Sequence, residues 1–173
     1  PSARSQRRED AEGGFCATSI TSIDRADLPE QAMIGRRRVA TSGQETAVGY
    51  AYDDQNIFAK ILRGEIPNKT VLETEHTLAF ADIQPQAPVH VLVIPKGPYV
   101  SLDHFTQEAS DAEILDFNRA IGKVCEMTKV ETKDGGMGFR AITNAGEHGH
   151  QEVPHLHVHI LGGRQLGRML PRD

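Results

Sequence analysis

The sequence predicts an α+β fold, in which one antiparallel sheet of about five strands packs with one long and one short helix. Apolar and polar residues alternate over residues 155–160, which is typical of a half-buried strand. Between Gln107 and Val130 apolar residues recur at three- and four-residue steps, which is typical of a helix. Four further short apolar segments bounded by turn residues are predicted strands: Thr70–Glu73, Thr77–Ile83, Val89–Pro95 and Phe139–Thr143.

The short helix is predicted over residues 56–63. Asp54 or Asn56 can cap its first turn, and Gly64 follows its last turn, where glycine commonly ends a helix. One apolar face at i, i+1, i+4 and i+5 spacing supports the prediction: Ile57, Phe58, Ile61 and Leu62. We expect much of this face to lie in the core.

The long helix is predicted to begin near Asp103 or Thr106, either of which can serve as its N-cap. Acidic residues follow, and they are favourable near the positive end of a helix. The apolar positions that define its buried face are Ile114, Phe117, Ile121, Val124 and Cys125. We expect this helix to pack across the sheet.

Composition excludes several classes of function. The 173-residue chain has a formal net charge of −5, which offers no basic footprint for nucleic acid. Its apolar runs are shorter than the roughly 20 residues that a membrane-spanning helix needs. Two isolated cysteines are too few for a disulfide framework and favour a reducing compartment. We therefore expect no nucleic-acid or membrane partner.

The first part of the chain differs in composition from the rest. Residues 1–52 are rich in Ser, Thr, Gly, Ala and Arg without hydrophobic periodicity, which predicts a flexible or disordered extension before a folded domain over 53–173. Arginine and serine are common in organellar transit sequences, but acidic residues in the same stretch argue against one. The expected location is cytoplasmic, with a mitochondrial location as the alternative.

Three histidines occupy alternate positions of the last predicted strand: His155, His157 and His159. Along a strand, neighbouring imidazoles would lie about 6.5–7 Å apart on one face. They can be solvated on an open face, bind a metal, or act as nucleophile and acid–base groups. An adjacent pair can share a zinc ion, but the outer two are roughly 13 Å apart. The residues alone favour the metal and catalytic interpretations about equally.

Four sequence blocks carry a specific resemblance. They read NIFAKILRGEIP at 56–67, AFADIQPQAPVH at 79–90, VIPK at 93–96 and HLHVHILGGR at 155–164. In this order and spacing they resemble the histidine triad (HIT) nucleotide-binding proteins, in particular the Hint or protein kinase C inhibitor-like branch. The resemblance extends from about residue 53 to residue 164. It implies a HIT domain over 53–173, a homodimer whose sheets join into one larger sheet, and neither cofactor nor metal.

The resemblance also implies a nucleotide site. It assigns the ribose hydroxyls to Asp82, whose carboxylate offers paired acceptors. The residues expected around the purine base are Ile57, Phe58, Ile61, Phe80, Ala81 and Ile83, and those expected around the α-phosphate are His90, Asn144, Gln151, Val153, His157 and His159. The implied substrates are adenosine 5′-phosphoramidates and aminoacyl-adenylate-like compounds, with release of AMP or GMP.

The catalytic hypothesis that follows is a purine nucleoside phosphoramidase. Neutral His157 attacks phosphorus and forms a nucleotidyl-histidine that water hydrolyses, while His159 and His90 donate to the phosphate oxygens. His155 orients its neighbours. Glu152 stands where animal members of the branch carry serine, so the proton donor to the leaving amine is open among Glu152, His148 and His150.

Three alternatives to this hypothesis stay open. The nearest is a Fhit-type dinucleoside polyphosphate hydrolase. The second is a nucleotide-binding scaffold protein whose catalysis is incidental. A zinc-dependent function is the third.

Overall fold

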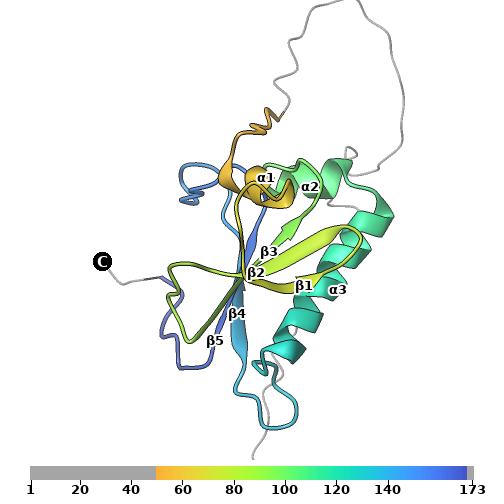
Figure 1. Cartoon of the computed structure of the whole chain (residues 1–173). Helices are drawn as coiled ribbons and strands as arrows, with labels where there is room; N and C mark the ends of the chain where they lie inside the picture. Colours follow the sequence, from red (N-terminus) through yellow and green to blue (C-terminus); the bar gives the residue numbers. More distant parts are fainter. Residues whose placement is uncertain (1–49, 171–173) are drawn as a thin grey trace, which may run out of the picture. The chain divides into compact units, whose positions relative to one another are not determined.

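The computed structural model describes residues 50–170, which form a five-stranded antiparallel sheet with three helices (Figure 1). The strands lie in the order β1-β2-β3-β5-β4. The elements along the chain are α1 (Ile57–Leu62), β1 (Thr70–Glu73), β2 (Thr77–Ala81), β3 (Val89–Pro95), α2 (Leu102–Glu108), α3 (Asp111–Met127), β4 (Phe139–Ile142) and β5 (Val158–Gly162). The predicted α+β class and five-stranded sheet are confirmed.

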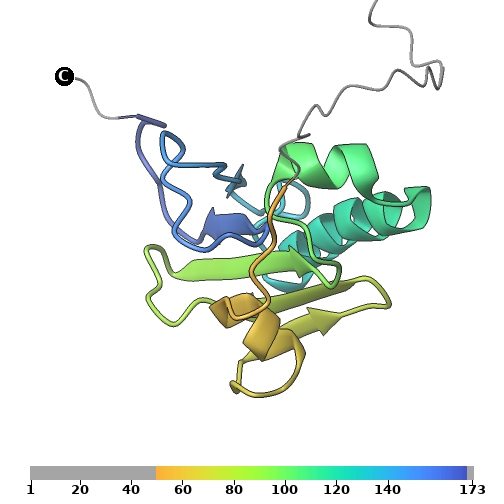
Figure 2. The same cartoon turned by 90° about the horizontal axis from the view of Figure 1, so that it is seen from above.

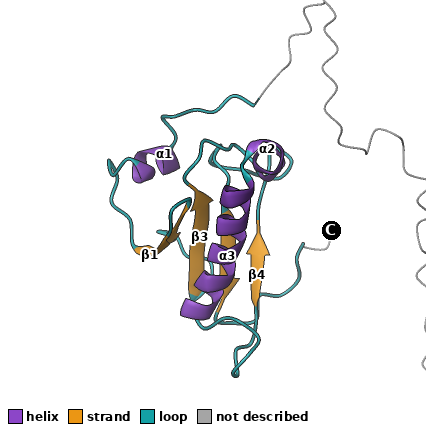
Figure 3. Cartoon of the chain, turned by 90° about the vertical axis from the view of Figure 1, so that its right-hand side faces the viewer, coloured by secondary structure: helices purple, strands orange, loops and turns teal. Residues whose placement is uncertain are grey.

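Alternation along the strands gives the sheet two distinct apolar faces. On one face Val91 and Val93 of β3 pack with Phe117 and Val124 of α3, and Figure 3 shows α3 lying across the strands. On the other face Leu92 belongs to a second cluster, in which α1 meets β2 and β3: Phe58, Ile61, Leu78, Phe80, Leu92 and Ile94. The long helix therefore covers one face and leaves the other, beside α1, to side chains that can form a site.

The short helix α1 begins and ends as its sequence predicts. The Asn56 side chain accepts hydrogen bonds from the backbone N–H groups of Phe58 and Ala59, at 3.0 and 2.9 Å. Such a cap satisfies donors that have no partner inside the helix. After the C-cap Arg63, Gly64 adopts a φ of 75°, which glycine accepts without strain.

The long helical stretch is divided into two helices, so the prediction of one helix with its N-cap at Asp103 or Thr106 was wrong. Helix α2 ends at Glu108, and α3 starts afresh after Ser110. The Ser110 hydroxyl accepts from the Glu113 N–H while the Glu113 carboxylate accepts from the Ser110 N–H, which is a capping box. The Ser-x-x-Glu pattern was present in the sequence and marks this start.

The histidine strand is shorter than predicted. β5 begins at Val158, so His155 and His157 precede the ladder. Two hydrogen bonds bend the backbone there: the His155 N–H donates to the Val153 carbonyl at 2.8 Å, and the Leu156 N–H donates to the Tyr99 carbonyl at 2.7 Å. The ring centroids of His157 and His159 are 4.9 Å apart, closer than regular strand spacing would put them. The bend therefore gathers the imidazoles.

The predicted extension lies almost wholly outside the described residues. Tyr50 and Tyr52, at its end, contact α2 and the histidine segment. Figure 2 shows residues 50–56, which precede α1, running from the side of α2 past β3 to α1. Within residues 50–170, none of the helices combines the length and apolarity needed to span a membrane.

Candidate active site

The register of the sheet brings histidines from two strands together. His159 of β5 lies opposite Leu92 of β3, and His90 of β3 lies opposite Leu161 of β5. Because these positions share one face of an antiparallel pair, the two imidazoles point to the same side. That side carries Leu92 and α1, and it is the face opposite α3.

His157 is held with one ring nitrogen committed and the other available. Its Nδ1 lies 2.7 Å from the backbone carbonyl of His155, and because a carbonyl only accepts, Nδ1 carries the hydrogen. In the neutral ring, Nε2 then bears the lone pair. Phe58 packs edge-on against the ring, with centroids 5.2 Å apart. Burial lowers the pKa of His157, so the neutral, nucleophilic form persists to a lower pH than in an exposed imidazole.

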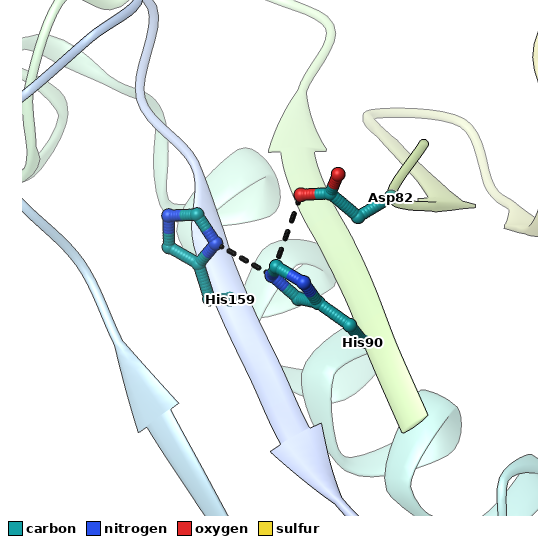
Figure 4. A group of neighbouring side chains, drawn as sticks. All are labelled: Asp82, His90 and His159. Atoms are coloured by element: carbon teal, nitrogen blue, oxygen red, sulfur yellow. Dashed lines mark hydrogen bonds and ion pairs between the residues drawn. The ribbon is translucent and has the colours of Figure 1, made fainter. Parts of the chain in front are cut away.

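His90 and His159 form a relay of ring hydrogen bonds. The Gln86 N–H donates to Nδ1 of His90 at 3.2 Å, so the other nitrogen of a neutral His90, Nε2, carries the hydrogen. That Nε2 donates to Nδ1 of His159 at 2.9 Å (Figure 4). In a neutral His159 the hydrogen consequently sits on Nε2. The relay therefore fixes His159 as a hydrogen-bond donor to whatever occupies the site.

Both members of the relay are neutral near pH 7. Burial, together with the neighbouring His157 and His90, lowers the pKa of His159 to about 4. Burial also lowers the pKa of His90, against the opposing effect of the Asp82 carboxylate. The cluster therefore works through N–H dipoles and lone pairs rather than through imidazolium charges.

Asp82 follows β2 and lies beside the relay. Its N–H donates to the His90 carbonyl at 3.0 Å, and its Oδ2 lies 3.4 Å from His90 Nε2. Oδ1 accepts from the Gln84 N–H at 2.7 Å. The carboxylate keeps acceptor capacity on both oxygens for further donors.

Asp82, His90 and His159 each offer one potential ligand atom within 4.8 Å of the others, a spacing that can hold a metal ion. The hydrogen bond between the two rings uses the nitrogens that face each other. The expectation that the protein needs no metal stays a prediction.

A groove in two compartments runs over these residues. The polar compartment is a cavity of about 200 Å³ over the histidines, and the apolar compartment is a cavity of about 350 Å³ beneath α1. The two share seven lining residues, so they adjoin: Phe58, Asp82, Gln86, Leu92, Glu152, Val153 and His159. Together they offer an apolar floor next to a row of imidazoles.

Most residues that the sequence predicts for the site line this groove. Asn144, His90, Glu152, Val153, His157 and His159 line the polar compartment with Phe58 and Asp82. The six residues predicted around the base all line the apolar compartment: Ile57, Phe58, Ile61, Phe80, Ala81 and Ile83.

Two predicted residues lie behind the groove. His155 is fully buried, with Nε2 donating to the Pro95 carbonyl at 2.9 Å. Gln151 uses its side-chain amide to hold the loop before the histidines: it donates to the Val100 and Val153 carbonyls and accepts from the Gly146 N–H. Both residues shape the site from outside the cavity.

Sequence reasoning missed other lining residues. Leu92 forms part of the floor, and its place two residues after His90 in a strand could have indicated this. Ile66, Pro67 and Asn68 close the apolar compartment from the turn after α1. No periodic signal marks that turn.

Two exposed residues stand at the mouth of the polar compartment. His150 Nε2 and the Glu152 carboxylate are 3.7 Å apart, and their side chains are 88% and 82% exposed. His150 adopts a φ of 56°, a left-handed conformation that is uncommon for residues other than glycine. Both side chains therefore face the solvent and the polar compartment.

The fold and the site define a class of protein: an α+β domain whose sheet carries a row of imidazoles beside an apolar pocket and a carboxylate. The model of the HIT domain family matches residues 63–166. This chain belongs to the HIT domain family.

Relatives and solved structures agree with that assignment. A HIT-like protein from Azospirillum brasilense is 54% identical over 121 residues, covering 70% of this chain and 96% of the relative. The purine nucleoside phosphoramidase of Escherichia coli is 38% identical over 120 residues, covering 68% of this chain and 94% of the relative. The structure of a histidine triad protein from Clostridium difficile is similar with a TM-score of 0.55 and 42% identity, covering 65% of this chain and 93% of that one.

Proposed function

We propose that this protein is a purine nucleoside phosphoramidase that cleaves the phosphorus–nitrogen bond of adenosine 5′-phosphoramidates and aminoacyl-adenylate-like substrates and releases AMP or GMP. One observation carries the proposal: the 2.7 Å hydrogen bond from His157 Nδ1 to the His155 carbonyl leaves Nε2 with its lone pair in a residue that lines the groove. Membership in the HIT family supports nucleotide hydrolysis as the general activity. The Escherichia coli phosphoramidase supports the particular bond.

The substrate would lie along the two compartments. The purine base would enter the apolar compartment between Ile57 and Ile83, and the α-phosphate would lie in the polar compartment beside His157. Asp82 lines both compartments, so its carboxylate can accept hydrogen bonds from the ribose hydroxyls between them.

The reaction would proceed in two displacements. In the first, Nε2 of His157 forms a bond to the α-phosphorus while the phosphorus–nitrogen bond breaks, and the leaving amine takes that electron pair and a proton. In the second, water attacks the phosphorus, the nucleotidyl-histidine bond breaks and Nε2 regains its lone pair, while the proton released from the water returns to the group that protonated the amine. The His159 N–H would donate to a non-bridging oxygen in both transition states.

The proton for the leaving amine would come from the mouth of the groove. Glu152 and His150 lie there, within 3.7 Å of each other. We assign the donor role to His150, because its ring lines the polar compartment and a ring N–H can reach a leaving amine. Glu152 would hold His150 in place.

The proposal is tested by trapping the covalent intermediate. Wild-type protein mixed with adenosine 5′-phosphoramidate and quenched in milliseconds should show an added adenylate by intact mass, on the peptide that contains His157. His157→Ala should show none and should lose at least about a thousandfold in kcat. Turnover of diadenosine triphosphate faster than of the phosphoramidate would instead favour the Fhit-type alternative.

We also propose that the protein forms a homodimer through β4, which lies at one end of the sheet. An apolar cavity of about 300 Å³ lies between β4 and helices α2 and α3, where Leu102 is 40% exposed. Thr143 at this cavity has a buried hydroxyl that lacks a hydrogen-bond partner among residues 50–170. A second copy placed here could pair with the strand edge and satisfy that hydroxyl.

Sedimentation tests the dimer. Wild type should sediment as two chains, and Ala141→Arg, which puts a charge at this cavity, should sediment as one. Met137→Arg, in the exposed loop before β4, serves as the control that should stay dimeric.

A further inference from the structure

Tyr52 reaches the histidine row from outside the sheet. It lies in the segment before α1, and its hydroxyl is 2.6 Å from Nδ1 of His155. The two rings meet at an angle of 64° with centroids 5.5 Å apart. His155 is fully buried, so this contact lies behind the groove and outside the nucleotide pocket.

The direction of this hydrogen bond follows from the far side of the His155 ring. There Nε2 lies 2.9 Å from the Pro95 carbonyl, which can only accept, so Nε2 carries the hydrogen. Burial lowers the pKa of His155 to about 4, so the ring is neutral and Nδ1 holds a lone pair. Burial also raises the pKa of Tyr52, which keeps the phenol protonated. Tyr52 is therefore the donor.

The position of His155 depends on hydrogen bonds made by its side chain. It precedes the β5 ladder, which begins at Val158, so regular strand pairing does not hold its carbonyl. Yet that carbonyl accepts the Nδ1–H of His157 and so decides which nitrogen of His157 is nucleophilic. The ring of His155 is tied on one side to the end of β3 through Pro95 and on the other side to Tyr52.

We infer that Tyr52 is a positioning residue: its hydroxyl holds His155 in the Nε2–H tautomer and fixed orientation that aim the His155 carbonyl at His157. The inference deepens the proposed function and rests on it for its kinetic consequence. Its structural consequence, the tautomer of His155, is independent of any reaction. Tyr52 is thereby the residue of the segment before α1 that supports the active site.

Tyr50 provides a matched control on the same segment. Its ring stacks on His104 with centroids 4.2 Å apart and an interplanar angle of 7°, and its hydroxyl donates to Asp103 at 2.5 Å. These contacts fix the segment to α2 without touching the histidine row. Tyr50→Phe and Tyr52→Phe each remove one hydroxyl and keep the ring, but only the second removes a contact to the row.

The experiment compares both variants with wild type by kinetics and by nitrogen NMR of the histidine rings. In wild type, His155 should show a protonated Nε2 and an unprotonated, hydrogen-bonded Nδ1. Tyr52→Phe should shift or broaden the His155 ring signals and lower kcat about tenfold, with KM within about twofold, since one net hydrogen bond corresponds to roughly that factor. Tyr50→Phe should change neither.

The outcomes separate the inference from the proposed function. A wild-type His155 with its proton on Nδ1 overturns the inference whether or not the variants fold. Unchanged kcat and unchanged His155 signals in a folded Tyr52→Phe also overturn it and leave the proposed function intact. A wild type without phosphoramidase activity removes the proposed function, and the ring spectra still decide the role of Tyr52.

Discussion

His90 and His159 are joined ring to ring across two strands, with Nε2 of His90 donating to Nδ1 of His159 over 2.9 Å. The pair is aligned by the register of β3 and β5, and the Gln86 N–H fixes its direction at the far end. The relay ends in an N–H of His159 at the groove. The hydrogen bond from the Gln86 N–H to His90 thus determines that Nε2 of His159 is a hydrogen-bond donor.

Breaking the relay should weaken catalysis without removing the nucleophile. His90→Ala leaves His159 free to exchange tautomers, so we expect kcat to fall about 10- to 100-fold, the usual effect of losing a group that orients a functional histidine. Steady-state kinetics on adenosine 5′-phosphoramidate measures it. His76→Gln, in the β1–β2 turn, should leave kcat unchanged. Equal losses in both variants would contradict the role of the relay.

Asp82 should contribute to binding through the ribose. Asp82→Asn weakens hydrogen bonds to a charged acceptor, so we expect KM for the ribonucleoside substrate to rise about 10- to 100-fold. The matched comparison is a 2′-deoxy substrate, for which wild type should already bind weakly and the variant should lose less. A variant that loses equally on both substrates would argue against contact between Asp82 and the ribose.

Alternation over residues 155–160 and four short apolar segments bounded by turn residues predicted the five strands of the sheet, because strand signals are local to the segment. The division between α2 and α3 was missed because apolar steps from Ile114 onward say nothing about where a helix starts, and the capping pair Ser110 and Glu113 was not weighed. The bend before Val158 was missed because it depends on the carbonyl of Tyr99, far away in the sequence.

Some site residues could be predicted from the sequence, and others depend on contacts between distant segments. Those in recognisable blocks, such as Phe58 and Asp82, could be named from resemblance. Tyr52 could not be named, because its role depends on a tertiary contact to His155 that has no periodic or motif signature. Resemblance also placed Gln151 at the phosphate, while its amide is engaged by three backbone groups of the surrounding loop.

The pH dependence of catalysis should reflect the lowered pKa of His157. Because burial keeps the ring neutral below the usual range, kcat/KM should stay constant from neutral pH down to about pH 6.5. Activity should be lost only at lower pH, as Nε2 becomes protonated. Rate profiles from pH 4 to pH 8 measure this. A loss that begins above pH 6.5 would contradict a neutral, buried nucleophile.

The capping box of α3 should contribute measurably to stability. Ser110→Ala leaves the Glu113 N–H without its acceptor, and we expect the free energy of unfolding to fall by about 1 kcal/mol. Urea denaturation followed by circular dichroism measures it. Ser110→Thr keeps a hydroxyl and should lose much less. Equal losses for alanine and threonine would mean that the cap is not the cause.

The buried histidines should make folding stability depend on acid. Burial lowers the pKa of His155 and of His159 to about 4 in the folded protein, while the unfolded chain titrates near 6.5. Between these values the unfolded state binds more protons, so the free energy of unfolding should fall as pH drops from 6.5 toward 4. Below pH 4 these two groups should cause no further loss.

A variant isolates the contribution of one ring. His159→Gln removes one of the two protonation sites, so its stability should fall less steeply over the same pH window than that of wild type. Urea unfolding at half-unit pH steps measures both slopes. If His159→Gln and wild type lost stability in parallel, His159 would not be a neutral ring in the folded state, and its place as the terminal donor of the relay would have to be abandoned.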